Sequence, residues 1–152
     1  MESTTTYQSP IGPLGIEVDD QDRLVRIDYW APPSTPISPD HPVATALDSY
    51  FAGDPAALDD LDVHLSVGSF QQNVLETARK IPAGETRTYS WIASKIGHPG
   101  AARAVGNALG KNPVPIVIPC HRVVAASGLG GYTGGLEIKT SLLQIESRVP
   151  AS

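Results

Sequence analysis

The sequence lacks most of the features that mark secreted, membrane-bound or metal-dependent proteins. It has one cysteine among 152 residues, so an internal disulfide is impossible and a thiolate-rich zinc site is not expected. His41 and His64 alone do not have the spacing of a metal site, and we expect no metal or other cofactor. No apolar run approaches the roughly 18 residues of a membrane span, and the first residues lack a secretory signal. We therefore expect a cytoplasmic protein without membrane contact, associated with the nucleoid if its source is prokaryotic.

Charge is distributed unevenly along a chain of otherwise ordinary composition. With 41% hydrophobic and 18% charged residues, the chain should fold rather than remain disordered. Residues 1–70 carry two basic and twelve acidic groups, a net charge of −10, whereas residues 71–152 carry nine basic and four acidic groups, a net charge of +5. A basic half can hold a polyanion while an acidic half discourages non-specific binding. Ordinary scatter of solvated charge gives the same asymmetry.

The first half predicts a small α/β lobe with an antiparallel sheet. Alternating apolar residues predict strands within 7–18, with a Pro/Gly interruption, and over 24–29, which returns as the second arm of a hairpin. The segment 32–42 contains five prolines and predicts an extended surface loop. Residues 43–51 predict a short helix, and 59–67 predict another short strand that leads into the second half.

We expect two domains, an N-terminal α/β lobe of residues 1–68 and a mainly helical domain of residues 69–152. The second domain opens with a predicted helix over 69–78. Ser69 and Gln72 have the spacing of a capping box, in which a hydroxyl and a side-chain amide satisfy free N–H groups at a helix start.

Two further predicted helices have the proportions of a helix-turn-helix. Thr88 can cap a helix over 89–96, and a helix over 101–109 follows a tight Gly/Pro turn. The second helix consists mostly of alanine and glycine, with one long cation, Arg103. Small side chains allow a backbone to approach a DNA minor groove, where docking is largely independent of sequence. Any small helical domain can contain such a pair, and the same residues also suit tight packing between helices.

The only thiol of the chain lies in an unusual setting. Residues 116–118 predict a short buried strand, and Pro119 should end it directly before Cys120. The neighbours His121 and Arg122 create a positive local field, which lowers the pKa of a thiol and populates the nucleophilic thiolate. Adjacent residues on an extended backbone point to opposite sides, so contact between the thiol and the imidazole needs a turn or a bridging water. Most lone cysteines are inert and buried, which is the alternative.

Two features near the end of the chain can complete a site around this cysteine. Residues 127–135 include five glycines, whose backbone can form a wall or lid beside a planar ligand, or an ordinary hairpin connection. The helix expected from Glu137 onward places Ile138 and Leu142 on one face, with Glu146 near it. A carboxylate buried there needs a partner such as an imidazole, whereas an exposed one is an ordinary surface group.

These segments resemble the O⁶-alkylguanine-DNA alkyltransferases, also called methylated-DNA–protein-cysteine methyltransferases. The resemblance spans nearly the whole chain, loosely before residue 68 and closely after it. The residues that carry it are Ser9-Pro10-Ile11-Gly12-Pro13-Leu14, Gly84-Glu85-Thr86 with Tyr89, Ala101-Ala102-Arg103-Ala104-Val105-Gly106, Asn112-Pro113, Ile118-Pro119-Cys120-His121-Arg122-Val123-Val124, Ser127-Gly128, Gly131-Tyr132, and Leu142-Leu143 with Glu146. It implies a ribonuclease-H-like α/β lobe packed on a mainly helical lobe, which carries the helix-turn-helix and the reactive cysteine at a strand end.

The resemblance implies DNA repair by a protein that reacts only once. Cys120 would accept an alkyl group from O⁶-alkylguanine, and less readily from O⁴-alkylthymine, to form a permanent thioether. Glu146 would hold the tautomer of His121, which would take the thiol proton through a water molecule. Asn112 would tie the helix-turn-helix to the active-site strand.

The resemblance also implies double-stranded DNA as the partner, bound in the minor groove without sequence preference by a monomer, with cooperative binding left open. The target nucleotide must leave the duplex, because its alkyl carbon lies inside the stack. Tyr89 would crowd the 3′ phosphate and donate to the base, and Arg103 would fill the vacated space. The other expected DNA-binding residues are Ala101, Ala102, Gly106 and Arg122, and the expected base pocket is lined by Leu109, Val123, Gly131, Tyr132 and Thr133.

Two other functions fit part of the sequence. A non-catalytic DNA-binding protein could recognise alkylated bases, although family relatives of that type lack the cysteine. A cysteine hydrolase could use Cys120, His121 and Glu146 as a covalent-catalysis triad, but that function leaves Arg103 and the basic half unexplained. Alkyl transfer is therefore the function that the sequence favours.

Overall fold

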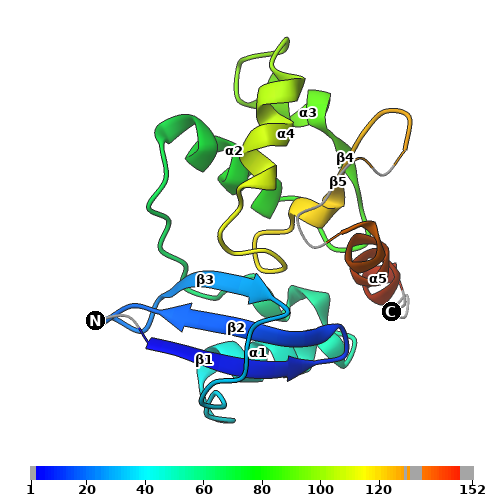
Figure 1. Ribbon diagram of the computed structural model, residues 1–152. Helices are drawn as coiled ribbons and strands as arrows, with labels where there is room; N and C mark the ends of the chain where they lie inside the picture. Colours follow the sequence, from blue (N-terminus) through cyan, green and yellow to red (C-terminus); the bar gives the residue numbers. More distant parts are fainter. Residues whose placement is uncertain (1–2, 129, 131–134, 148–152) are drawn as a thin grey trace.

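The structure, a computed structural model, describes residues 3–128, 130 and 135–147. A three-stranded sheet with helix α1 lies at one end of the molecule, and a group of helices lies at the other (Figure 1). This arrangement confirms the predicted mixed α/β fold with an antiparallel sheet and a mainly helical second part. Within the described residues, no helix combines the length and the apolar character that crossing a membrane requires.

The sheet forms from the alternating residues of the first half. Strands β1 (Ser3–Ser9), β2 (Gly12–Val18) and β3 (Leu24–Tyr29) are antiparallel in the order β1-β2-β3. Ile16 of β2 pairs with Ile27 of β3, and both side chains are buried. The predicted hairpin is therefore confirmed, because one apolar face of the pair is turned into the core.

Helix α1 (Pro42–Phe51) packs against this sheet and confirms the helix predicted for the segment. Proline fits the first helical position because the N–H it lacks would have no partner within the helix. Before it, His41 caps the helix by accepting the Val43 N–H at 3.1 Å. The ring of Tyr7 from β1 stacks on Phe51 with centroids 6.4 Å apart, so strand and helix share one core.

The predictions for two connecting segments of the first half turn out differently. The proline-rich segment 32–42 is an extended loop up to the start of α1, as predicted, and an isolated bridge joins its Pro36 to Thr6 of β1. The strand predicted for 59–67 is wrong. After a short 3-10 helix, η1 (Pro55–Leu58), these residues, all of them described, form only an isolated bridge between Val63 and Leu24. The aspartates at the start of the segment disfavour strand structure, and a single bridge does not extend into a ladder.

The helices of the second part lie where periodicity predicts them. They are α2 (Ser69–Arg79), α3 (Tyr89–Lys95) and α4 (Ala102–Gly110). Thr88 caps α3 by accepting the Trp91 N–H at 3.1 Å, which confirms its predicted role.

The capping box predicted at the start of α2 is wrong. Gly68 is the N-cap residue, and Ser69 is already the first helical residue. The Ser69 hydroxyl is therefore one position too late to receive the N–H that a capping box satisfies. The Gln72 side chain instead donates to Glu76 one turn further along the helix, at 3.0 Å.

The segment before the cysteine also differs from the prediction. Residues 116–118 are buried as expected, but they form a tight turn rather than a strand. Ile116 has a φ of +74°, far from the strand region. Pro115 and Pro119 on either side have no N–H to donate, so a strand ladder cannot propagate through the segment. The segment that begins with Cys120 is therefore a 3-10 helix, η2 (Cys120–Arg122), that follows a turn and precedes a strand.

The strand after η2 and the last helix complete the second part. Strand β5 (Val123–Val124) pairs in parallel with β4 (Arg87–Thr88), which leads directly into α3. Helix α5 (Leu136–Ser147) runs beside η2 and buries Ile138 and Leu142 against the core (Figure 1). The last helix is therefore confirmed, with its apolar face inward.

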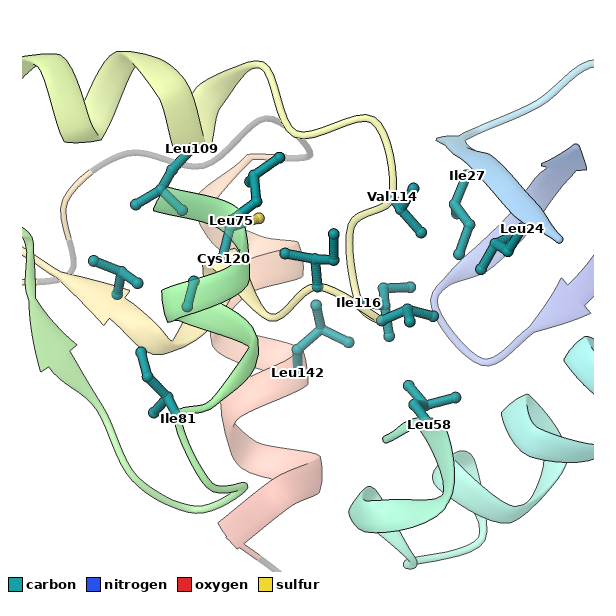
Figure 2. Close-up of a cluster of buried hydrophobic side chains, with 14 of the residues drawn as sticks. Leu24, Ile27, Leu58, Leu75, Ile81, Leu109, Val114, Ile116, Cys120 and Leu142 are labelled. Atoms are coloured by element: carbon teal, nitrogen blue, oxygen red, sulfur yellow. The ribbon is translucent and has the colours of Figure 1, made fainter. Parts of the chain in front are cut away.

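A single cluster of buried apolar side chains connects the two parts of the chain. Figure 2 shows Val114 and Ile116 from the turn before the cysteine facing Leu24 and Ile27 of the sheet. The Ile27 N–H also donates to the Pro113 carbonyl at 2.9 Å. Burial of each such side chain stabilises the fold by about 1.5–3 kcal/mol, so the sheet supports the turn that positions the cysteine. The domain boundary between residues 68 and 69 stays a prediction.

Candidate active site

Cys120 lies at the centre of a polar cluster within this core. Its side chain is 5% exposed, and its position is set by the Cys120 N–H, which donates to the Ile118 carbonyl at 2.8 Å. The Asn112 amide donates to Sγ at 3.2 Å. A hydrogen bond donated to sulfur favours the anionic form of a thiol, which is its nucleophilic form.

Asn112 connects the sulfur to the end of α4. Its backbone N–H donates to the Leu109 carbonyl at 3.1 Å, in the last turn of that helix. The side-chain amide donates to the Ile118 carbonyl at 2.9 Å as well as to Cys120, and its oxygen accepts the Val114 N–H at 2.9 Å. One buried residue therefore connects the end of α4, through its backbone, with the turn and the thiol, through its side chain.

His121 and Glu146 form a buried pair next to this cysteine. His121 Nε2 lies 2.6 Å from Glu146 Oε2, and both side chains are fully buried. Because a carboxylate only accepts, this contact places the proton on Nε2 and leaves Nδ1 as the basic nitrogen. The structure thus brings together Cys120, His121, Glu146 and Asn112, which come from different parts of the second half.

Arg122 completes the charge balance around Glu146. Its Nε donates to Oε1 and its Nη2 to Oε2, each at 2.9 Å, while Nη1 donates to the Ile81 carbonyl at 2.6 Å. Burial by itself would raise the pKa of Glu146, but the hydrogen bonds from His121 and Arg122 outweigh it and lower that pKa to about 2. Burial lowers the pKa of His121, against the opposing effect of Glu146. At neutral pH the pair is therefore a carboxylate and a neutral imidazole.

This placement corrects one prediction. Arg122 was expected to bind DNA, but its side chain is 4% exposed and its three donor nitrogens are bound inside the protein. The guanidinium therefore serves as the counter-charge of Glu146.

Lys139 of α5 is a member of the cluster that the sequence interpretation missed. Its side chain is fully buried, and Nζ donates to the Val123 carbonyl at 2.7 Å. Burial lowers the pKa of Lys139, whereas the charge of a Cys120 thiolate acts in the opposite direction. The spacing of Lys139, Leu142 and Glu146 along one helical face is the signal that could have found it.

Tyr50 of α1 is a second member that was missed. Its hydroxyl donates to Glu146 Oε2 at 2.7 Å, and its ring is fully buried. Since 96 residues separate Tyr50 from Glu146, no local pattern points to this contact.

The residues expected at the DNA interface lie on α3 and α4. Arg103 is exposed, and Ala101, Ala102 and Gly106 are half-buried, so α4 presents small residues and one long cation. Tyr89 opens α3 and is half-buried; a Cβ placed on Gly106 would lie 3.8 Å from its ring. A methyl group at position 106 would therefore make only an ordinary contact with the Tyr89 ring, so α4 and Tyr89 lie side by side without requiring glycine there.

The expected base pocket is only partly within the described residues. Val123 and Leu109 are both buried, at 0% and 4% exposed. Gly130 lies against Tyr89, with room for no side chain, since a Cβ there would lie 2.6 Å from the Tyr89 hydroxyl. The expected pocket residues Gly131, Tyr132 and Thr133 lie outside the described part of the chain.

Comparison with known proteins decides the family. A sequence profile described as "6-O-methylguanine DNA methyltransferase, DNA binding domain" matches residues 69–148. The methylated-DNA–protein-cysteine methyltransferase of Mycobacterium tuberculosis is 46% identical over 156 residues, covering 96% of this chain and 93% of that protein. The chain belongs to the 6-O-methylguanine DNA methyltransferase family. The protein of the same name from Metallosphaera sedula is another member, 40% identical over 144 residues, with 93% and 90% covered.

A solved structure supports the same family assignment at the level of the fold. The crystal structure of Mycobacterium tuberculosis OGT in complex with DNA matches with a TM-score of 0.84 and 42% identity, covering 97% of this chain and 95% of that one. Because the match covers nearly all of both chains, the family fold extends over the sheet and α1 as well as over the segment that the profile matches.

Proposed function

We propose that this family member repairs DNA by transferring an alkyl group from the O⁶ atom of guanine to Sγ of its own Cys120. The observation that carries the proposal is the buried arrangement of Asn112, Cys120, His121 and Glu146, in which a thiol lies among an amide donor, a neutral imidazole and an ionised carboxylate. DNA is the partner, as the DNA-binding profile and the DNA complex of the M. tuberculosis relative support.

The reaction is a single in-line displacement. His121, acting through a water molecule, takes the proton of the Cys120 thiol on Nδ1 and is held in the required tautomer by Glu146. The sulfur electron pair forms the new S–C bond while the bond between O⁶ and the alkyl carbon breaks. The electrons of that bond remain on guanine, which takes a proton donated by Tyr89 and leaves as the normal base. The thioether has no route back to a thiol, so each molecule acts once.

Two groups favour the thiolate over the thiol before the reaction. The Asn112 amide lies 3.2 Å from Sγ, and the buried ammonium of Lys139 interacts electrostatically with Cys120. A cation and a donated hydrogen bond both stabilise an anion most in a site that excludes water. The low exposure of Cys120 therefore strengthens these interactions.

We place the DNA minor groove along α4. The small residues Ala101, Ala102 and Gly106 allow close approach of the helix, and the exposed Arg103 fills the space of an extruded nucleotide. Tyr89, at the start of α3, crowds the 3′ phosphate of that nucleotide. Binding is independent of sequence and by a monomer, with the alkylated base as the specific target. A cytoplasmic location stays a prediction.

The test is the mass of the peptide that contains Cys120 after the protein has been mixed with an O⁶-methylguanine duplex. Permanent addition of one methyl group to this peptide supports alkyl transfer, and an unmethylated duplex is the control. Tight binding without modification would indicate a non-catalytic reader of alkylated bases. Turnover of an ester or amide without methylation would indicate a hydrolase.

A further inference from the structure

We propose that Tyr50, from helix α1 in the first half of the chain, is a positioning residue of the alkyl-transfer site that tunes His121 through Glu146. The inference rests on the proposed function, because it concerns the proton transfer that activates Cys120. It gives the first half of the chain, which carries the sheet, a part in the chemistry through Glu146, in addition to its part in the shared core.

The geometry carries the proposal. The Tyr50 hydroxyl donates to Glu146 Oε2 at 2.7 Å, and the same oxygen accepts His121 Nε2 at 2.6 Å. Arg122 Nη2 donates to this oxygen as well, at 2.9 Å. Tyr50 and His121 therefore share one acceptor atom, and any change in the Tyr50 hydrogen bond alters the charge available to the imidazole.

The hydroxyl is held rigidly in place. The Tyr50 ring is 0% exposed and makes an edge contact with Phe51, with centroids 5.1 Å apart. Burial raises the pKa of Tyr50 far above its ordinary value, and the nearby Glu146 carboxylate adds to this effect. Tyr50 therefore remains a neutral donor at every pH at which the protein works.

The expected direction follows from hydrogen bonding to an anion. A donated O–H spreads part of the negative charge of Oε2 onto Tyr50, which weakens the pull of that oxygen on the His121 proton. Without the hydroxyl, the carboxylate would stabilise the imidazolium form of His121 more strongly. Tyr50 thus keeps His121 neutral and able to accept the thiol proton.

The other charged and titratable groups around the pair stay unchanged when only the Tyr50 hydroxyl is removed. Those facing this cluster are Tyr29 of β3, Asp59 after η1, Arg122 of η2 and Lys139 of α5, and Lys139 in turn interacts with Cys120. A shift in the titration of His121 can therefore be assigned to the missing hydroxyl.

The test compares Tyr50→Phe with the matched control Tyr7→Phe. Tyr7 also lies in the first half, is nearly buried, and donates to a carboxylate, Asp48 Oδ1, at 2.7 Å. Both variants lose one tyrosine–carboxylate hydrogen bond, so their thermal stabilities should fall by similar amounts. The two readouts are the pKa of His121 from ¹⁵N NMR and the pH dependence of single-turnover methyl transfer.

We expect Tyr50→Phe to raise the His121 pKa by about half a pH unit or more, while Tyr7→Phe leaves it at the wild-type value. A base with a higher pKa is protonated over a wider acidic range, so transfer by Tyr50→Phe should fall about threefold on the acidic side of the profile. Incorporation of 3-fluorotyrosine at position 50, a stronger donor, should shift both readouts the opposite way. That variant keeps the ring and the hydroxyl, and it serves if Tyr50→Phe does not fold.

The outcomes separate the two proposals. If wild-type protein does not methylate Cys120, the proposed function is wrong and this inference falls with it. If wild-type protein does methylate Cys120 but the variants at position 50 titrate like Tyr7→Phe, only the inference is overturned, and Tyr50 is a packing residue.

Discussion

We expect Glu146→Gln to destabilise the folded protein by about 3 kcal/mol at neutral pH. Hydrogen bonds from His121 and Arg122 overcome burial and lower the Glu146 pKa from its ordinary 4.5 to about 2. Since one pKa unit corresponds to about 1.4 kcal/mol, this lowering contributes about 3 kcal/mol to folding. Glutamine removes this contribution and also leaves the buried Arg122 guanidinium without its counter-charge. The loss of stability should therefore be at least this large.

The sign of the pH dependence is fixed by the direction of this pKa change. A carboxyl whose pKa is depressed in the folded state stabilises fully above its ordinary pKa of 4.5, and the contribution disappears as the pH falls through about 2. The stability difference between wild type and Glu146→Gln should therefore shrink across this window. His121, whose pKa is lowered by burial and raised by Glu146, adds a further loss of stability below the ordinary histidine value, and this loss is larger in Glu146→Gln, which lacks the opposing effect of Glu146.

Urea denaturation from about pH 7 down to about pH 3 measures both effects. Glu137→Gln is the matched control, since Glu137 lies on the same helix but is exposed, and its replacement should change stability little. In thermal scans the loss expected for Glu146→Gln corresponds to about 6–12 °C in Tm. A loss below about 1 kcal/mol, or one that does not depend on pH, would refute a paired, ionised Glu146.

Three other variants test the remaining parts of the site. Cys120→Ala should abolish methyl transfer and retain binding to alkylated DNA, as a mobility shift would measure; loss of both would mean that the thiol is structural. Arg103→Ala should slow repair of duplex DNA much more than reaction with free benzylguanine, because only the duplex requires extrusion, and equal losses would contradict that role. Lys139→Met should keep or raise stability, since a buried charge is removed, and slow transfer at neutral pH; unchanged transfer would show that the ammonium does not act on the thiol.

Local patterns predicted the elements that hold the site, because those patterns are physical requirements of each element. The alternation of apolar and polar residues in β2 and β3 predicted the hairpin, because one face of the strand pair has to be buried. Thr88 caps α3 as expected, because a helix start leaves free N–H groups. The burial of Glu146 required only a partner such as an imidazole; the family resemblance named His121, and the structure pairs the two.

The parts that sequence did not predict depend on contacts between distant segments. The apolar residues 116–118 looked like a strand, but prolines on both sides and the left-handed backbone of Ile116 make a turn that only the surrounding core stabilises. In the sequence, Tyr50 has the pattern of an ordinary core residue of α1. Only the packing of that helix in the fold brings its hydroxyl to Glu146. Lys139 was missed although its spacing from Leu142 and Glu146 places it on the same face of α5, because lysine side chains are usually exposed.

Counting methyl groups transferred per protein molecule decides whether Cys120 is a single-use acceptor. With DNA labelled in the O⁶-methyl group and present in excess, the label on protein should rise to one per molecule and stay there, with all of it on Cys120 and none on Cys120→Ala. Label that keeps increasing beyond one per molecule, or that is found on another residue, would contradict direct transfer to this thiol.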